Sequence, residues 1–256
     1  MVRKMLKVYH TADDRVVERE HIDGKGSWLC LINPTEKEMQ LVSSRTGITQ
    51  RPRIEIEPGQ ILIIIKVPVA KGQKDAEIYD AIPLGIIITK DYLVTVCLDD
   101  HPVFFQMLKE PVLYTFKKTR FLLLILIKTA TLYLNYLRIL DKRSTELQQH
   151  LQLLDIQKSL VYFTTSLRAN GIVMEKLTRT QLVKAEEAPA SMLVKMYPED
   201  EDLLEDAITE NRQAIEMSSI YSSILTGSMD AYAALISNNV SVVMKFLTSV
   251  TIVLSL

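Results

Sequence analysis

The last 58 residues place the strongest constraint on this 256-residue chain, because Glu199 to Leu256 contain no proline and one glycine, Gly227. Pro198 comes directly before this segment, and the segment begins with four successive acids. This composition is typical of a helix N-terminus. A single helix of this length would span about 87 Å at about 1.5 Å per residue. We therefore predict a projecting helix that needs partner helices to cover its apolar side.

The side chains of this helix leave two interpretations open. Large apolar residues recur along it at Leu204, Ile208, Ile215, Ile220, Ile224, Leu235 and Val242. Serine, threonine and asparagine are scattered between them. One interpretation is a soluble coiled-coil stalk. The other is an oligomeric stalk around a wet axis, because small residues allow close helix packing and polar residues tolerate water.

The chain ends on an uncharged apolar stretch, FLTSVTIVLSL, which follows Lys245. A transmembrane helix needs about 20 mainly apolar residues, so these eleven residues are too few for a complete span. Such a stretch would be a sticky end on a soluble protein, whereas a lysine just before it is typical of a membrane boundary. We therefore predict that residues 246–256 are the start of a truncated transmembrane helix.

The first hundred residues contain runs of Ile, Val and Leu that predict strands at 28–34, 61–69, 84–89 and 92–98. Short connections at 57–60 and 90–91 predict two antiparallel hairpins. Several runs are apolar on both faces, which indicates helices on both sides of a sheet. We expect one of these helices at 34–47, between Pro34 and Gly47.

Between Val112 and Ala188 there is no proline, and apolar residues recur at helical spacing. This stretch is too long for one globular helix, so we predict two antiparallel helices with a break near 148–152. The apolar run at 121–127 predicts part of a buried helix and is too short to cross a bilayer. Residues 184–192 predict a linker that contains Pro189.

Charge and composition argue against several function classes. The net charge of −1 gives no general attraction to nucleic acid. The four histidines are dispersed, and Cys30 and Cys97 lie far apart in apolar runs, so neither a disulfide framework nor a His/Cys metal site is expected. We find no nucleophile–base pair and no phosphate-binding glycine loop, and therefore expect neither an enzyme nor an organic cofactor. The N-terminus lacks the apolar core of a secretory leader.

Several stretches, in order along the chain, resemble the CorA family of divalent-cation channels and transporters. They are WLCLINPTEKE (28–38), RPRIEIEPGQILIIIKVPV (51–69), IPLGIIITKDYLVTVCL (82–98), YTFKKTRFLLLILI (114–127), DIQKSLVYFTTSL (155–167), YPEDEDLLEDAITENRQAIEM (197–217) and SNNVSVVMKFLT (237–248). The last is the most specific, because a similar segment carries the family's stalk helix into its first transmembrane helix. The family's Gly-Met-Asn motif and second transmembrane helix would come after Leu256.

The resemblance implies an α+β fold: an α/β/α-type N-terminal domain with a mixed sheet, followed by long antiparallel helices and a stalk helix. The expected divisions are an α/β cytoplasmic domain at 1–111, an antiparallel helical pair at 112–188, the long stalk helix at 199–245 and the start of the transmembrane helix at 246–256. It also implies a homo-oligomer, a pentamer in the intact protein, in which the stalk helix packs against its copies in neighbouring protomers. The C-terminal segment would meet the cell membrane, with this portion cytoplasmic and with no nucleic acid partner.

The resemblance further implies the regulatory funnel of a transporter for Mg²⁺, with Co²⁺ or Ni²⁺ as other possible cargo. Mg²⁺ prefers oxygen ligands, and the acids implied to sense it are Asp206, Glu205, Asp202 and Glu201. A cation between subunits would screen these like charges and hold the pore closed. The residues implied to line the pore are Ser241, Met244, Leu247 and Thr251. Their spacings of three, three and four residues place them on one helical face.

Other interpretations of the same residues remain open. The acids at 199–206 also suit the positive end of a helix dipole and water, and the four pore candidates also suit packing against lipid or another helix. The whole chain could be a soluble helical interaction or scaffold protein. It could also belong to a zinc-transporting branch of the same family, which shares the scaffold.

Overall fold

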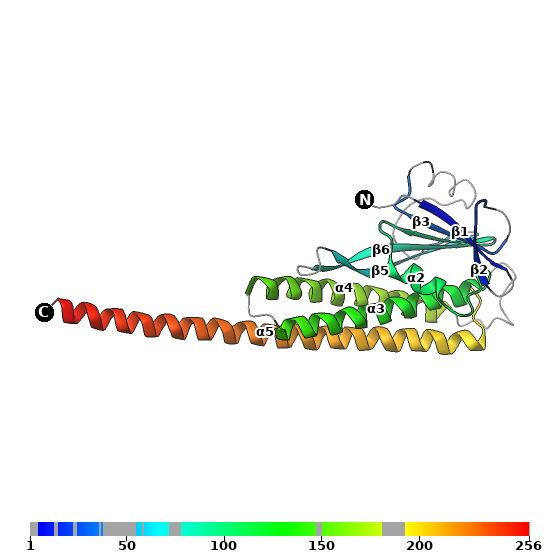
Figure 1. Ribbon diagram of the computed structural model, residues 1–256. Helices are drawn as coiled ribbons and strands as arrows, with labels where there is room; N and C mark the ends of the chain where they lie inside the picture. Colours follow the sequence, from blue (N-terminus) through cyan, green and yellow to red (C-terminus); the bar gives the residue numbers. More distant parts are fainter. Residues whose placement is uncertain are drawn as a thin grey trace.

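The computed structural model describes residues 5–12, 15–22, 25–35, 37, 55–57, 59–71, 78–146, 150–180 and 193–255. The strands are β1 (Met5–Ala12), β2 (Arg15–Arg19), β3 (Ser27–Ile32), β4 (Glu55–Glu57), β5 (Gln60–Lys71), β6 (Ile78–Thr89) and β7 (Tyr92–Cys97). The helices are α2 (Pro102–Leu108), α3 (Lys118–Glu146), α4 (His150–Thr180) and α5 (Pro198–Leu254). The sheet lies against α3 and α4, α5 packs on these two helices, and the end of α5 extends far beyond the rest of the molecule (Figure 1).

The seven strands form one mixed sheet in the order β2-β1-β3-β7-β6-β5-β4. Among the described strands, only β3 and β7 pair in parallel, and the other neighbours are antiparallel. Both predicted hairpins are present: Glu57 pairs with Gln60, and Ile88 pairs with Leu93 around a tight turn. The hairpin of β1 and β2 was not predicted. The mixed sheet and the α+β fold class are therefore confirmed.

The middle of the sheet is buried on both faces. Successive side chains of a strand point to opposite faces, and every residue of β3 is buried. On β3, Trp28 belongs to a cluster that includes Phe121 of α3, while Leu29 belongs to a separate cluster with Val94 of β7. Each of these four side chains is fully buried. The helix predicted at 34–47 lies almost entirely outside the described residues.

Three long helices form a bundle beside the sheet (Figure 1). Helix α3 ends at Glu146 and α4 begins at His150, near the predicted break. Helices α3 and α4 run antiparallel to each other (Figure 1). Thr131 of α3 donates to Glu210 of α5 at 2.8 Å, and Asn211 of α5 donates to the Leu167 carbonyl oxygen of α4 at 3.1 Å.

The first half of α5 packs on α3 and α4 of its own chain. Its buried residues are spaced by four and three residues in turn up to Ser218: Asp200, Leu204, Ala207, Asn211, Ala214, Ser218 and Leu225. We expected the stalk to find its partners in neighbouring protomers, but this half is covered within the chain. A helix with this burial repeat presents one continuous stripe to its neighbours, and α3 and α4 are long enough to occupy it.

The second half of α5 projects without cover. From Ala231 to Ser255, every side chain whose exposure is described is exposed. Helix α5 has 57 residues, so its length is about 86 Å at about 1.5 Å per residue. The predicted projecting helix is therefore confirmed, and only its second half still lacks a partner.

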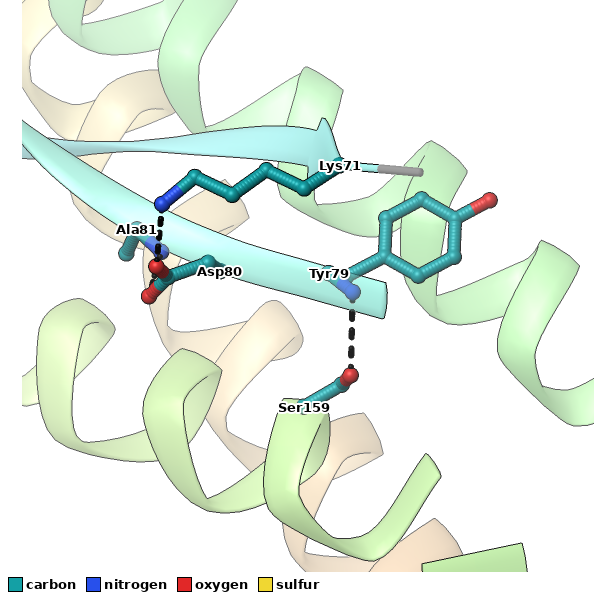
Figure 2. Close-up of polar contacts among 5 residues, drawn as sticks. All are labelled: Lys71, Tyr79, Asp80, Ala81 and Ser159. Atoms are coloured by element: carbon teal, nitrogen blue, oxygen red, sulfur yellow. Dashed lines mark hydrogen bonds and ion pairs between the residues drawn. The ribbon is translucent and has the colours of Figure 1, made fainter. Parts of the chain in front are cut away.

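The β5–β6 hairpin is fixed to α4 along its length. Asn170, which is 2% exposed, accepts from the Lys66 N–H at 2.8 Å and donates to the Lys66 carbonyl oxygen at 2.8 Å. Farther along, the Tyr79 N–H donates to the Ser159 hydroxyl at 3.1 Å (Figure 2). These contacts satisfy strand groups that would otherwise be left unpaired against the helix.

The exposed side of the same hairpin carries an ion pair. Lys71 donates to Asp80 at 2.7 Å, and the Ala81 N–H donates to the other carboxylate oxygen at 2.7 Å (Figure 2). Partial burial opposes ionisation, but these two hydrogen bonds and the charge of Lys71 together hold the pKa of Asp80 below its ordinary value. The contacts link the two strands close to Lys71 and Ile78, the last pair of residues in their described pairing.

His101 caps α2 in its neutral form. Its Nδ1 accepts from the Val103 N–H at 3.2 Å, and its Nε2 lies 2.8 Å from the Pro68 carbonyl oxygen. An N–H must donate and a carbonyl oxygen must accept, so Nδ1 is unprotonated and Nε2 carries the proton. The ring is 1% exposed, and this burial lowers the pKa of His101 below its ordinary value.

Protonation of His101 should therefore destabilise the fold. The unfolded state takes up the proton at a higher pH than the folded state, so stability falls as pH drops below about 6.5. Between pH 7.5 and 5.5 we expect the free energy of unfolding to fall by about 1 kcal/mol more in the natural protein than in His101→Asn, which keeps a capping side chain. Urea titrations at several pH values measure the difference, and parallel pH curves would contradict it.

Candidate functional site on the stalk helix

The acids predicted to sense cation lie on the outer surface of α5. All four are exposed: Glu201, Asp202, Glu205 and Asp206. Leu204 lies between these acids in the sequence and Ala207 directly follows them, and both are buried in the core. The acids form two pairs four residues apart, which places like charges next to each other on the helix. Among the described residues, no cationic side chain lies within ion-pair distance of them.

One neighbouring acid has a different role that we did not predict. Asp200 is 4% exposed and accepts from the Tyr197 N–H at 3.4 Å, which caps the start of α5. Burial raises the pKa of Asp200, while that hydrogen bond and the charges of Arg120 and Lys117 oppose the shift. The sequence signal was its position three residues after the helix cap, where a side chain reaches back to the cap N–H.

The predicted pore residues share one face of the projecting half of α5. Met244 and Leu247 are 56% and 57% exposed. The Ser241 and Thr251 hydroxyls donate to carbonyl oxygens of their own helix, four residues earlier, at 2.9 and 2.8 Å. All four therefore lie on a helical surface that the chain itself does not cover.

In the described part of the chain, no group of three or more His, Cys, Asp or Glu side chains is placed to hold a metal ion. Two described helices have the length and composition to cross a membrane. In α3, 56% of the apolar window is buried in the protein, which identifies it as the predicted core helix. In α5, the corresponding window is 0% buried.

The mixed sheet, the three-helix bundle and the uncovered apolar helix agree with the protein family that the sequence matches. The sequence model of the family described as CorA-like Mg²⁺ transporter proteins matches residues 23–256. This chain belongs to the CorA-like family. Members of the family are membrane transporters of divalent cations rather than enzymes.

Individual relatives agree with this membership. The curated cobalt/magnesium transport protein CorA of Methanocaldococcus jannaschii is 28% identical over 251 residues, which cover 88% of this chain and 74% of that protein. The complete structure of the CorA magnesium transporter from the same organism superposes with a TM-score of 0.74 at 23% identity, over 98% of this chain and 83% of that one.

A further solved structure shares this fold. The cytoplasmic domain of ZntB from Vibrio parahaemolyticus gives a TM-score of 0.64 at 12% identity, over 90% of this chain and 98% of that one. At such low identity the match concerns the fold alone. It therefore does not identify the cation that this chain handles.

Proposed function

We propose that this chain forms the cytoplasmic funnel and the pore entrance of a homopentameric Mg²⁺ or Co²⁺ transporter of the CorA-like family. The observation that carries the proposal is the division of α5 into two halves. The first half is held by α3 and α4, whereas the second half projects with an uncovered apolar surface. A rigid base with a projecting apolar helix suits a stalk that delivers its end to a membrane.

The exposed apolar residues of the projecting half support an oligomer. Those beyond residue 230 are Tyr232, Leu235, Ile236, Val240, Val242, Val243, Met244, Phe246, Leu247, Val250, Ile252 and Leu254. They surround the helix rather than forming one narrow stripe, so water alone is a poor environment for them. Copies of α5 would cover one side, and lipid would cover the rest near the end. A water-soluble scaffold protein would leave this surface uncovered.

The outward acids of α5 supply a sensor in this proposal. Asp206 and Asp202, with Glu205 and Glu201, place like charges on a surface that neighbouring protomers would share. A divalent cation between protomers offsets that repulsion, because hard cations bind carboxylate oxygens directly or through their own waters. When the cation leaves, the acids repel and the funnel loosens. This couples cytoplasmic Mg²⁺ to pore opening.

Met244 and Leu247 supply a gate in the same proposal. Five copies of these apolar side chains around an axis would make a constriction that excludes water and blocks hydrated ions. Ser241 and Thr251 lie on either side of it and would contact ions through water or hydroxyl groups. Separation of the stalk helices would widen and wet the constriction.

The oligomeric state tests the proposal directly. Native mass spectrometry of the 256-residue chain, purified in detergent with Mg²⁺, should give a pentamer. A Leu235→Glu variant should weaken the assembly, because it places a charge in the proposed interface. A strict monomer would support the soluble scaffold interpretation instead.

A further inference from the structure

A pocket lies where the chain enters α5, at the end of the molecule opposite the apolar tail. Its volume is about 590 Å³, and its walls are the start of α3 and residues 193–200. The Thr119 hydroxyl joins the two walls by donating to the Lys195 carbonyl oxygen at 2.8 Å. Small-molecule sites usually have volumes of about 300–1,000 Å³, so the pocket is large enough for a ligand of nucleotide size.

The pocket concentrates positive charge in a chain whose net charge is −1. Its lining includes the cationic side chains of Lys117, Lys118, Arg120 and Lys195. Lys118 already donates to the carbonyl oxygens of the β6–β7 turn. Among the described residues, none of the other three cations lies within ion-pair distance of an acid. Lys117 lies over the Tyr114 ring, 4.9 Å from its centroid. Arg120 and Lys195 therefore remain able to bind an anion.

Two acids also line the pocket, and they limit where an anion can bind. Asp200 is buried and engaged with the Tyr197 N–H, so the first turn of α5 is already capped and is not itself an anion site. Glu199 is exposed and can turn toward water. The attraction for an anion therefore comes from the cationic side chains of Arg120 and Lys195 rather than from the helix end.

The pocket also has aromatic walls. Phe116 and Tyr197 line it from its two sides and are 53% and 54% exposed. Exposed aromatic rings beside cationic groups are the combination that binds nucleotides in proteins, because bases stack on the rings and phosphates pair with the cations. An inorganic phosphate would contact the cationic groups but would leave the aromatic rings without a partner.

We propose that this pocket binds a nucleoside polyphosphate, with Arg120 and Lys195 on the phosphates and Phe116 or Tyr197 against the base. The ligand would connect the first turns of α3 and α5 and so hold the base of the stalk. This inference stands on the pocket alone and does not depend on the proposed transport function.

Isothermal titration calorimetry of the 256-residue chain at low salt and without Mg²⁺ tests the proposal. The probes are ATP, inorganic triphosphate and adenosine. We expect ATP to bind, and added salt to weaken it. Arg120→Gln and Lys195→Gln should each weaken ATP about tenfold, since each removes a charge-assisted contact. Arg168→Gln, which removes an exposed arginine of α4, should leave the affinity unchanged.

Phe116→Ala separates base binding from phosphate binding, because it should weaken ATP while leaving triphosphate unchanged. Thermal unfolding without ligand shows whether each variant is folded. The proposal is overturned if millimolar ATP gives no binding heat, or if Arg168→Gln weakens ATP as much as the pocket variants do. Triphosphate binding as tight as that of ATP would overturn the assignment of a nucleotide.

Discussion

Phe163→Ala should lower the free energy of unfolding by about 3–5 kcal/mol, which is the usual cost of removing a large aromatic side chain from a core. Phe163 is fully buried on α4. Its ring meets Tyr133 of α3 edge to face, with ring centroids 4.9 Å apart, and Tyr79 of β6 at 6.2 Å. The ring therefore joins the sheet to two helices of the bundle. Alanine would leave a cavity that three different elements would have to close.

Tyr162→Ala is the matched control, because it removes an aromatic ring from the adjacent position of the same helix. Tyr162 is 48% exposed, so we expect a loss of less than about 1 kcal/mol. Urea titrations followed by far-ultraviolet circular dichroism compare the two variants. Equal losses would mean that Phe163 does not hold the bundle and the sheet together.

Asp206→Asn should make the protein much less responsive to Mg²⁺. In the proposed sensor each protomer contributes this carboxylate to an interface, so the substitution removes one ligand charge from every site of the ring at once. We expect the Mg²⁺ concentration that gives half-maximal protection from trypsin to rise about tenfold or more, since each lost 1.4 kcal/mol of binding is a tenfold change. Asparagine keeps the size of the side chain and should leave the α5 helix intact.

Asp230→Asn is the control for this experiment, because Asp230 is exposed on the same helix and the substitution is the same. It should leave the Mg²⁺ dependence unchanged. Unchanged protection in Asp206→Asn would contradict the proposed sensor. Protection that fails equally in both variants would indicate a general effect of the negative charge on α5. Single substitutions of Glu201, Asp202 and Glu205 measure how much each acid contributes to the Mg²⁺ dependence.

Local signals predicted much of the fold correctly. The Lys90–Asp91 turn between two apolar runs was enough to predict the β6–β7 hairpin, because a two-residue connection restricts how the strands can pair. The run at 121–127 was predicted as a buried helix from its helical flanks, and Phe121 and Leu122 are fully buried in α3. The β1–β2 hairpin was missed because its strands are more polar and β2 is mostly exposed.

The candidate site could be predicted only in part. The sequence located the acidic start of the long helix, but did not separate buried Asp200 from the four exposed acids. That difference depends on which side of α5 meets α3 and α4, which local composition does not reveal. The pocket beside Arg120 was missed for a similar reason. It brings together residues about 75 positions apart in the chain, and no short motif records such a contact.

By itself, the sequence determined that the chain ends in one very long helix, because after Pro198 no residue stops it and one glycine is tolerated. It also indicated the CorA-like family through stretches spread along the chain. Only the tertiary structure decided which half of that helix is held and which half projects. An apolar stripe shows that a helix needs a partner, but burial by α3 and α4 depends on how their surfaces fit α5. That fit ends near Leu225 and leaves the apolar remainder uncovered.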